Sequence, residues 1–124
     1  IQIKETFTID DIKNLDSTKK TVIICDCEGF EKYLFTAESV PLLKNTDVLI
    51  ETHDFIELTI SSTIADLFKS THNIQTIASL DDNLKAKQYQ YKEAEQQDIY
   101  TKKELFAEVR PCTMEWIWAT TKNK

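Results

Sequence analysis

The chain has 124 residues and carries 15 Lys plus Arg against 21 Asp plus Glu, for a net charge of −6. This length suits one domain with a single core, and the acidic balance argues against a non-specific nucleic-acid binder, which needs a basic surface. No apolar run approaches the roughly 20 residues that a membrane span needs, so we expect neither nucleic acid nor a membrane as a partner.

The first predicted elements are a short amphipathic helix and a buried strand. Thr8 and Asp11 match a variant of the capping box, and apolar residues follow at helical spacing, which predicts a helix over residues 8–15. A strand is predicted over Thr21 to Cys25, because its apolar residues follow one another without interruption. Such a run is typical of a strand that is buried on both faces of a parallel sheet.

A second helix and a second strand repeat this arrangement. Gly29 begins a helix-like segment that runs toward Pro41, and DVLIE (residues 47–51) is again apolar and ends in an acid. A strand, a helix and a second strand form a βαβ unit whose two strands are parallel. Gly29 is the only glycine of the chain, so the sequence holds no phosphate or nucleotide loop built on repeated glycines.

The second half of the chain continues the alternation of helices and strands. The pattern predicts a helix over residues 59–71, a weaker strand over 74–78, a helix over 101–109 and a last strand over 114–119. Thr101 and Glu104 match a capping box for the second of these helices. Residues 81–97 are rich in charge and Gln, and they are interpreted as a solvated helix, a mobile insertion or a substrate-covering lid.

The three cysteines do not form a disulfide framework, and none of their spacings matches a zinc or redox motif. Cys25 and Cys27 are two residues apart at the predicted strand and should therefore point to the same face. We expect these two thiols and Cys112 to be buried and reduced, which fits a cytoplasmic protein.

Polar residues follow both strands of the predicted βαβ unit. Ligands of open α/β sheets bind outside the carboxyl ends of the strands, so these residues are candidates for a site. The candidates are Asp26, Glu28, Glu51, His53 and Asp54. A second interpretation of Asp26 or Glu28 is a cap on the helix that follows them, favoured by the helix dipole.

The two histidines and the single arginine are further candidates, and each is interpreted from its position in the sequence. His53 next to Asp54 is an oriented acid–base pair, a metal ligand or a hydrogen-bonding surface residue. His72 falls near the end of a predicted helix, where a positive charge would suit the helix dipole. Arg110 binds an anionic ligand group or pairs with one of the strand-end acids.

Two segments of the first half match the pattern of a known family. TFTIDDI (residues 6–12) corresponds to a T-L-D-D-L segment, and VIICDCEGFEKYLF (residues 22–35) to an apolar strand that ends in D-x-E-G-x-E. The residues matching this second motif are Asp26, Glu28, Gly29 and Glu31. Over residues 6–54 the chain therefore resembles the second half of the FkbM-type methyltransferases, a branch of the class I S-adenosylmethionine-dependent fold.

The resemblance implies an α/β fold. It is a three-layer, Rossmann-like half-domain with a mixed sheet in the order 4-5-7-6 of the class I methyltransferase scheme, the last strand being antiparallel. Class I enzymes bind the cofactor mainly through a glycine-rich loop after their first strand, and this sequence has no such loop. Residues 1–124 would then form a single domain, the C-terminal half of a larger methyltransferase domain, and would be inactive in isolation.

The resemblance also implies a reaction and roles for the candidate residues. The complete parent protein would transfer a methyl group from S-adenosylmethionine to a small molecule or sugar, with a carboxylate or a histidine accepting the proton of the attacking hydroxyl. The cofactor-binding residues would be Asp26 and Glu28, the catalytic residues Glu51, His53 and Asp54, and the substrate-binding residue Arg110.

Two other functions remain open. The first is metal-assisted methyl transfer, in which Asp26 with Glu51 or Asp54 supplies oxygen ligands for magnesium or calcium. The second is a non-catalytic interaction module that recruits a partner through an exposed sheet edge. The strand over residues 21–25 is expected at such an edge, so we expect a homodimer, an associated N-terminal half or aggregation.

Overall fold

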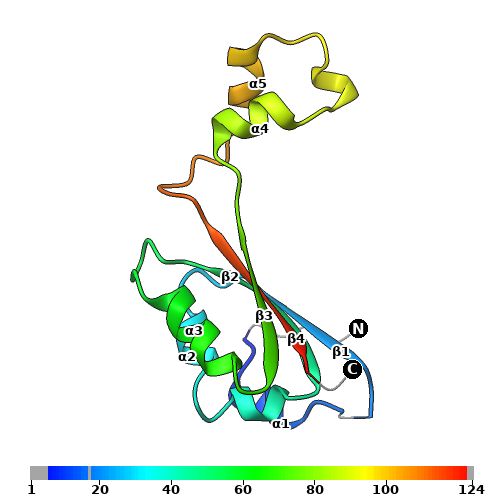
Figure 1. Ribbon diagram of the computed structural model, residues 1–124, viewed down its shortest axis with the longest axis vertical. Coiled ribbons are helices and arrows are strands. Elements are labelled where there is room, and N and C mark those ends of the chain that lie inside the picture. The colour runs from blue at the N-terminus through cyan, green and yellow to red at the C-terminus, as the bar shows by residue number, and fades with distance from the viewer. Residues whose placement is uncertain (1–5, 17, 123–124) are drawn as a thin grey trace.

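The computed structural model describes residues 6–16 and 18–122, in which helices and strands alternate along the chain (Figure 1). The strands are β1 (Thr21–Cys25), β2 (Thr46–Thr52), β3 (His72–Ala78) and β4 (Glu115–Thr121). The α-helices are α1 (Ile9–Lys13), α2 (Glu31–Leu34), α3 (Ile60–Phe68), α4 (Asp82–Gln88) and α5 (Ile99–Phe106). Two 3-10 turns, η1 (Val40–Leu43) and η2 (Lys92–Ala94), lie between them.

The four strands form one mixed sheet in the order β1-β2-β4-β3. β1 and β2 are parallel, and β4 is antiparallel to both of its neighbours, β2 and β3. The predicted α/β class and the predicted βαβ unit, made by β1, α2 and β2, are therefore confirmed. No helix among the described residues is long and apolar enough to cross a membrane.

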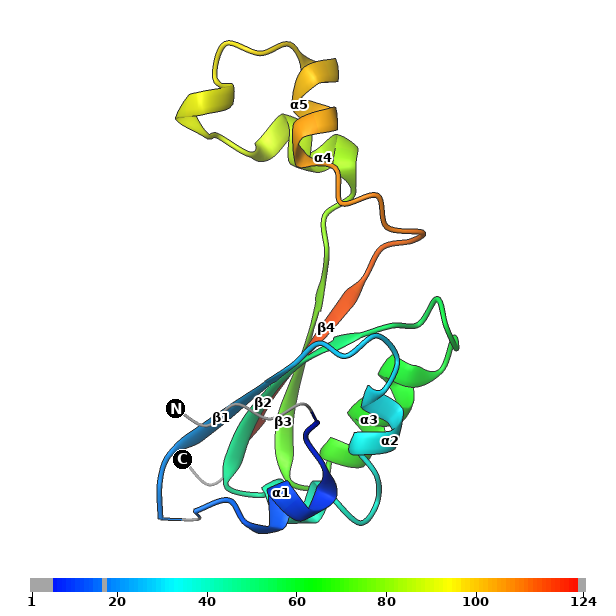
Figure 2. The same ribbon diagram turned by 180° about the vertical axis from the view of Figure 1, so that it is seen from behind.

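α1, α2 and α3 all lie on one face of the sheet (Figure 2). Both parallel connections, β1 to β2 and β2 to β3, run in the same direction across the sheet, and right-handed crossovers then place their helices on the same face. Within residues 6–16 and 18–122 the fold therefore has two layers, the sheet and the helices on one of its faces. The predicted third layer of helices, on the other face, is not found in this part of the chain.

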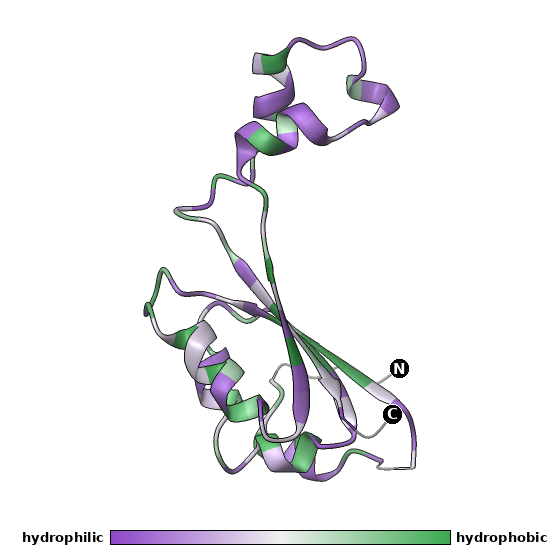
Figure 3. Ribbon diagram, in the orientation of Figure 1, coloured by the Kyte–Doolittle hydropathy of each residue, from purple (hydrophilic) through white to green (hydrophobic). Residues whose placement is uncertain are grey.

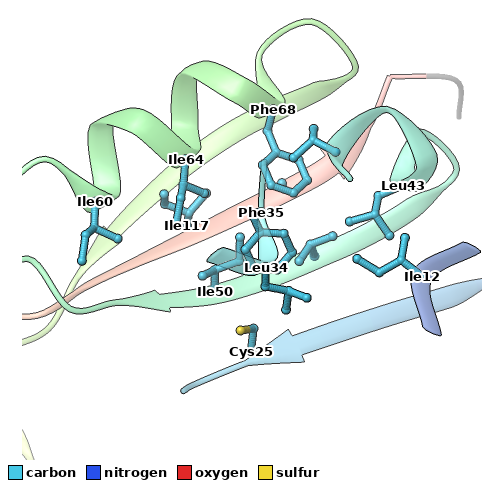
Figure 4. Close-up of a cluster of buried hydrophobic side chains, with 13 residues drawn as sticks. Ile12, Cys25, Leu34, Phe35, Leu43, Ile50, Ile60, Ile64, Phe68 and Ile117 are labelled. Atoms are coloured by element: carbon cyan, nitrogen blue, oxygen red, sulfur yellow. The ribbon is translucent and has the colours of Figure 1, made fainter. Parts of the chain in front are cut away.

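The core lies between these helices and the sheet (Figure 4). α3 contributes Ile60, Ile64 and Phe68, which recur every fourth residue on one side of the helix and are at most 2% exposed. They pack over Ile50 of β2 and Ile117 of β4, both fully buried. Phe35, which follows α2, meets Phe68 edge to face with ring centroids 5.5 Å apart, so the two helices share one aromatic contact.

Residues 81–106 form a helical hairpin that projects beyond the end of β3 and the start of β4 (Figure 1). α4 and α5 pack against each other, and most of the hairpin is hydrophilic (Figure 3). Its apolar contacts include Tyr89, Tyr91 and Phe106, whose ring centroids lie 5.5–5.9 Å apart. Residues 81–97 thus contain the helix α4 and the turn η2.

Two local predictions in the second half are wrong. The Thr101 capping box does not begin α5, because Asp98 lies three residues earlier and its side chain accepts hydrogen bonds from the backbone N–H groups of Tyr100 and Thr101. His72 does not cap a helix end, because it is the first residue of β3 and is fully buried. Its Nε2 donates to the backbone oxygen of Thr46, 2.9 Å away, so it joins two strands.

The cysteines divide into a close pair and an exposed residue. Cys25 is buried and Cys27 half-buried, with their Sγ atoms 3.4 Å apart, so the prediction that they share a face is confirmed. Burial raises the pKa of both thiols, which disfavours the reactive thiolate. The prediction of a buried thiol is wrong for Cys112, which lies exposed in the loop before β4.

β1 is the edge strand of the sheet, as predicted. Among residues 6–16 and 18–122 its pairing partner is β2 alone. Val22 and Ile24, which point away from the helices, are 51% and 71% exposed. The expectation that this apolar strand is buried on both faces is therefore wrong, because its outer face has no cover in the described part of the chain.

Candidate functional site

The turn after β1 brings acids to the carboxyl end of the parallel strand pair. Its backbone takes a left-handed course, with φ of 51° at Glu28 and 91° at Gly29. The positive φ favours glycine at position 29. A Cβ there would also lie 2.6 Å from Ile56 Cδ1, so the end of that side chain would have to move aside. Positive φ is uncommon for a residue with a side chain, so this turn fixes Glu28 in an orientation that a regular strand or helix would not give.

His53, one residue beyond β2, lies at the centre of these acids. Its side chain is 0% exposed, so the interpretation as a surface residue is wrong. Nδ1 lies 2.8 Å from Glu31 Oε1, and Nε2 lies 3.3 Å from Glu28 Oε2 and 3.6 Å from Asp26 Oδ1. The structure therefore gathers two of the predicted cofactor-binding residues around one of the predicted catalytic residues.

Glu31 belongs to this site although it was not among the predicted site residues. It is fully buried in the first turn of α2, where its Oε1 accepts a hydrogen bond from Cys27 N at 3.1 Å as well as contacting His53. The sequence signal was present, because Glu31 is the last acid of the D-x-E-G-x-E pattern. An acid in the first turn of a helix also interacts favourably with the helix dipole. Its position in the sequence therefore does not by itself indicate a contact with His53.

Asp54 makes a contact that the sequence analysis did not predict. Its carboxylate binds Ser61 in the first turn of α3, 2.8 Å from the backbone N and 2.5 Å from Oγ. The side chain of Thr59, at the N-cap position, makes no capping bond. Asp54 thus caps α3 and does not orient His53, so the acid–base pair predicted from their adjacency is wrong.

Asp54→Ala should therefore lower the free energy of unfolding by about 1 kcal/mol, the usual cost of removing a helix cap. Urea denaturation of the chain measures this loss. Asp66→Ala is the matched control, because Asp66 lies on the exposed side of α3 and pairs with Lys69 at the surface. Equal losses in the two variants would show that Asp54 is not the cap of α3.

Glu51 and Arg110 form a second charged group beside the first. Arg110 Nη1 donates to Oε1 of the buried Glu51, and Arg110 Nε lies 2.9 Å from Glu108 Oε2. Burial and the neighbouring Asp26 carboxylate raise the pKa of Glu51, and the guanidinium opposes that rise. Of the two predictions for Arg110, the pairing with a strand-end acid is the one the structure contains.

A small cavity of about 230 Å³ adjoins Arg110 at the base of the helical hairpin. Its charged lining includes Asp82, Lys85 and Glu108. Lys85 is buried and lies 2.7 Å from Glu108 Oε1, so its ammonium group is already engaged by an acid. The charged groups around this cavity satisfy one another.

The site as a whole places a buried imidazole among carboxylates, and several of its buried polar atoms can still form hydrogen bonds or bind a ligand. His53 Nε2, Glu31 Oε2 and Glu51 Oε2 are buried and have no hydrogen-bond partner among the described residues. Such an arrangement can accept protons, hold a cation or position a hydroxyl group. Comparisons of the chain with protein-family models, with curated proteins and with solved structures found no match.

Proposed function

We propose that this chain is the C-terminal portion of an S-adenosylmethionine-dependent methyltransferase that acts on a small molecule or sugar in the cytoplasm. The observation that carries the proposal is the strand order. If β1 to β4 are numbered 4 to 7 as in class I methyltransferases, the sheet has the order 4-5-7-6, with the antiparallel strand inserted between the fifth and the sixth. The polar cluster stands at the carboxyl ends of the parallel pair, where such folds bind ligands.

The uncovered face of the sheet supports a missing N-terminal half. Ile24, Leu49 and Trp118 are neighbours across three strands on the face opposite the helices. Ile24 is 71% exposed, and the other two are partly exposed. An upstream half would pair with the free edge of β1 and cover these apolar side chains; a homodimer is the alternative partner for the same edge.

In the proposed reaction the chain's residues act mainly by positioning. Asp26 and Glu28 lie on the side of the methyl donor, and a carboxylate of the cluster accepts the proton of the attacking hydroxyl. Glu31 orients His53 between these acids. Arg110 holds Glu51 in place on the acceptor side.

The test uses the complete natural polypeptide that contains this chain. Asp26→Ala and Glu28→Ala should each weaken S-adenosylmethionine binding at least about tenfold and leave the melting temperature almost unchanged, since both acids are exposed. Isothermal titration calorimetry and thermal melting measure the two effects. Asp10→Ala, an exposed acid of α1, is the control. If the melting temperature falls markedly together with the affinity, the acids are structural caps and the proposal is contradicted.

A further inference from the structure

His53 Nε2 is one of the three buried atoms of the site that have no hydrogen-bond partner among the described residues. The side chain is 0% exposed, and Nε2 has no hydrogen-bond partner among the described residues. It nevertheless faces Glu28 Oε2 at 3.3 Å and Asp26 Oδ1 at 3.6 Å. A buried polar atom without a partner costs about 1–3 kcal/mol, so a ligand that binds all three atoms together would remove that cost.

The separations of these atoms fit a shared metal ion. Nitrogen and oxygen ligands about 2.1 Å from one ion lie about 3.0 Å apart at octahedral right angles and about 3.4 Å apart at tetrahedral angles. The ligand atoms of Asp26, Glu28 and His53 all lie within 4.8 Å of one another. The Asp26 and Glu28 side chains are 49% and 80% exposed, so both carboxylates are free to move the remaining distance.

The imidazole is oriented as in protein metal sites. Metal-binding histidines usually donate the N–H of their second ring nitrogen to a carboxylate or carbonyl, which fixes the tautomer and leaves the other nitrogen for the metal. Glu31 Oε1 provides this contact, 2.8 Å from His53 Nδ1. Glu31 is itself fixed by burial and by the bond from Cys27 N, so Nε2 is held toward the two acids.

The local charge favours a cation. Asp26, Glu28 and Glu31 surround the imidazole, and Glu51 lies near the same end of the sheet in β2. Arg110 is the cation that pairs with Glu51, which leaves the other three carboxylates around a single imidazole. A divalent ion would neutralise this excess of negative charge.

We propose that Asp26, Glu28 and His53 bind one divalent first-row transition-metal ion, with Glu31 as the residue that orients His53. One imidazole nitrogen and two carboxylates suit Mn²⁺ or Zn²⁺ better than Mg²⁺ or Ca²⁺, which prefer oxygen ligands alone. Three protein ligands leave coordination positions open toward solvent. The site does not depend on the methyltransferase proposal, because the ion binds to the chain without cofactor or acceptor.

The experiment titrates Mn²⁺ into the 124-residue chain and follows free Mn²⁺ by electron paramagnetic resonance. We expect one bound ion per chain, nitrogen coupling in the spin-echo spectrum, displacement by Zn²⁺, and no displacement by a tenfold excess of Mg²⁺. Glu28→Gln and His53→Asn should each weaken binding at least about tenfold, and His53→Asn should abolish the nitrogen coupling. Glu31→Gln should weaken binding about 10- to 100-fold.

Two variants serve as matched controls. His72→Asn replaces the other buried histidine, which binds Thr46 rather than acids, and Asp66→Asn replaces an exposed acid with a surface lysine partner. Both should keep the wild-type affinity within about twofold. If His53→Asn fails to fold, the nitrogen coupling of the wild-type chain and the exposed Glu28→Gln variant decide the matter. Absent Mn²⁺ binding, binding without nitrogen coupling, or Glu28→Gln affinity equal to that of Asp66→Asn would overturn the proposal.

Discussion

Glu31→Ala is expected to lower the free energy of unfolding by about 2–6 kcal/mol, because it leaves two polar atoms without their partner and each such buried atom costs about 1–3 kcal/mol. Glu31 is fully buried, and its Oε1 serves both Cys27 N and His53 Nδ1. Alanine leaves both of those nitrogen atoms without their carboxylate partner. Urea denaturation of the 124-residue chain measures the loss.

Glu28→Ala is the matched control for this substitution. Glu28 contacts the same imidazole from the other side, but its side chain is 80% exposed. Water replaces the contact when the carboxylate is removed, so we expect a change of less than about 0.5 kcal/mol. A loss below about 1 kcal/mol for Glu31→Ala would mean that the buried carboxylate does not hold His53 in place.

Phe68→Ala is expected to destabilise the chain by a similar amount, about 3–5 kcal/mol. The ring is 0% exposed, contacts Phe35 edge to face at 5.5 Å, and lies 5.0 Å from the ring of His72. Its removal takes away apolar burial and leaves a cavity at the point where α3, α2 and β3 meet. Because the two neighbouring rings, Phe35 and His72, belong to different parts of the fold, they are unable to close that cavity together.

Tyr100→Ala provides the comparison for Phe68→Ala, since it also removes an aromatic ring from a helix. Tyr100 is 80% exposed in α5, and we expect its loss to cost less than about 1 kcal/mol. Chemical denaturation of both variants gives the two values. A Phe68→Ala loss as small as that of Tyr100→Ala would show that the aromatic contact between α2 and α3 is not part of the core.

The elements predicted correctly are those with a local signal. β1 and β2 are apolar runs that stop at acids, and parallel strands of a βαβ unit necessarily end on the same side. That topology places Asp26, Glu28 and His53 at one edge of the sheet, and the left-handed turn at Glu28 and Gly29 then orients Glu28. The capping pair of α1 was also local, and Asp11 Oδ2 accepts the backbone N–H of Thr8 at 2.9 Å.

Apart from the cap of α5, the predictions that failed depended on contacts between distant parts of the chain. His53 and Asp54 are adjacent in sequence just after β2, but their side chains contact different elements. His53 contacts Glu31 of α2, and Asp54 binds Ser61 of α3. The exposure of Ile24 depends on what covers the outer face of β1, which no local pattern records. The buried position of Glu31 depends on the left-handed turn at Gly29, which directs α2 back over the strand end.

The proposal that this chain is the C-terminal half of a methyltransferase domain is tested most directly by calorimetric titration of S-adenosylmethionine. The titration compares the 124-residue chain with the complete natural polypeptide that contains it. We predict a micromolar dissociation constant for the complete polypeptide and binding at least about 100-fold weaker for the chain, because the sequence has a single glycine and no glycine-rich cofactor loop. Micromolar binding by the 124-residue chain alone, or no binding by the complete polypeptide, would contradict it.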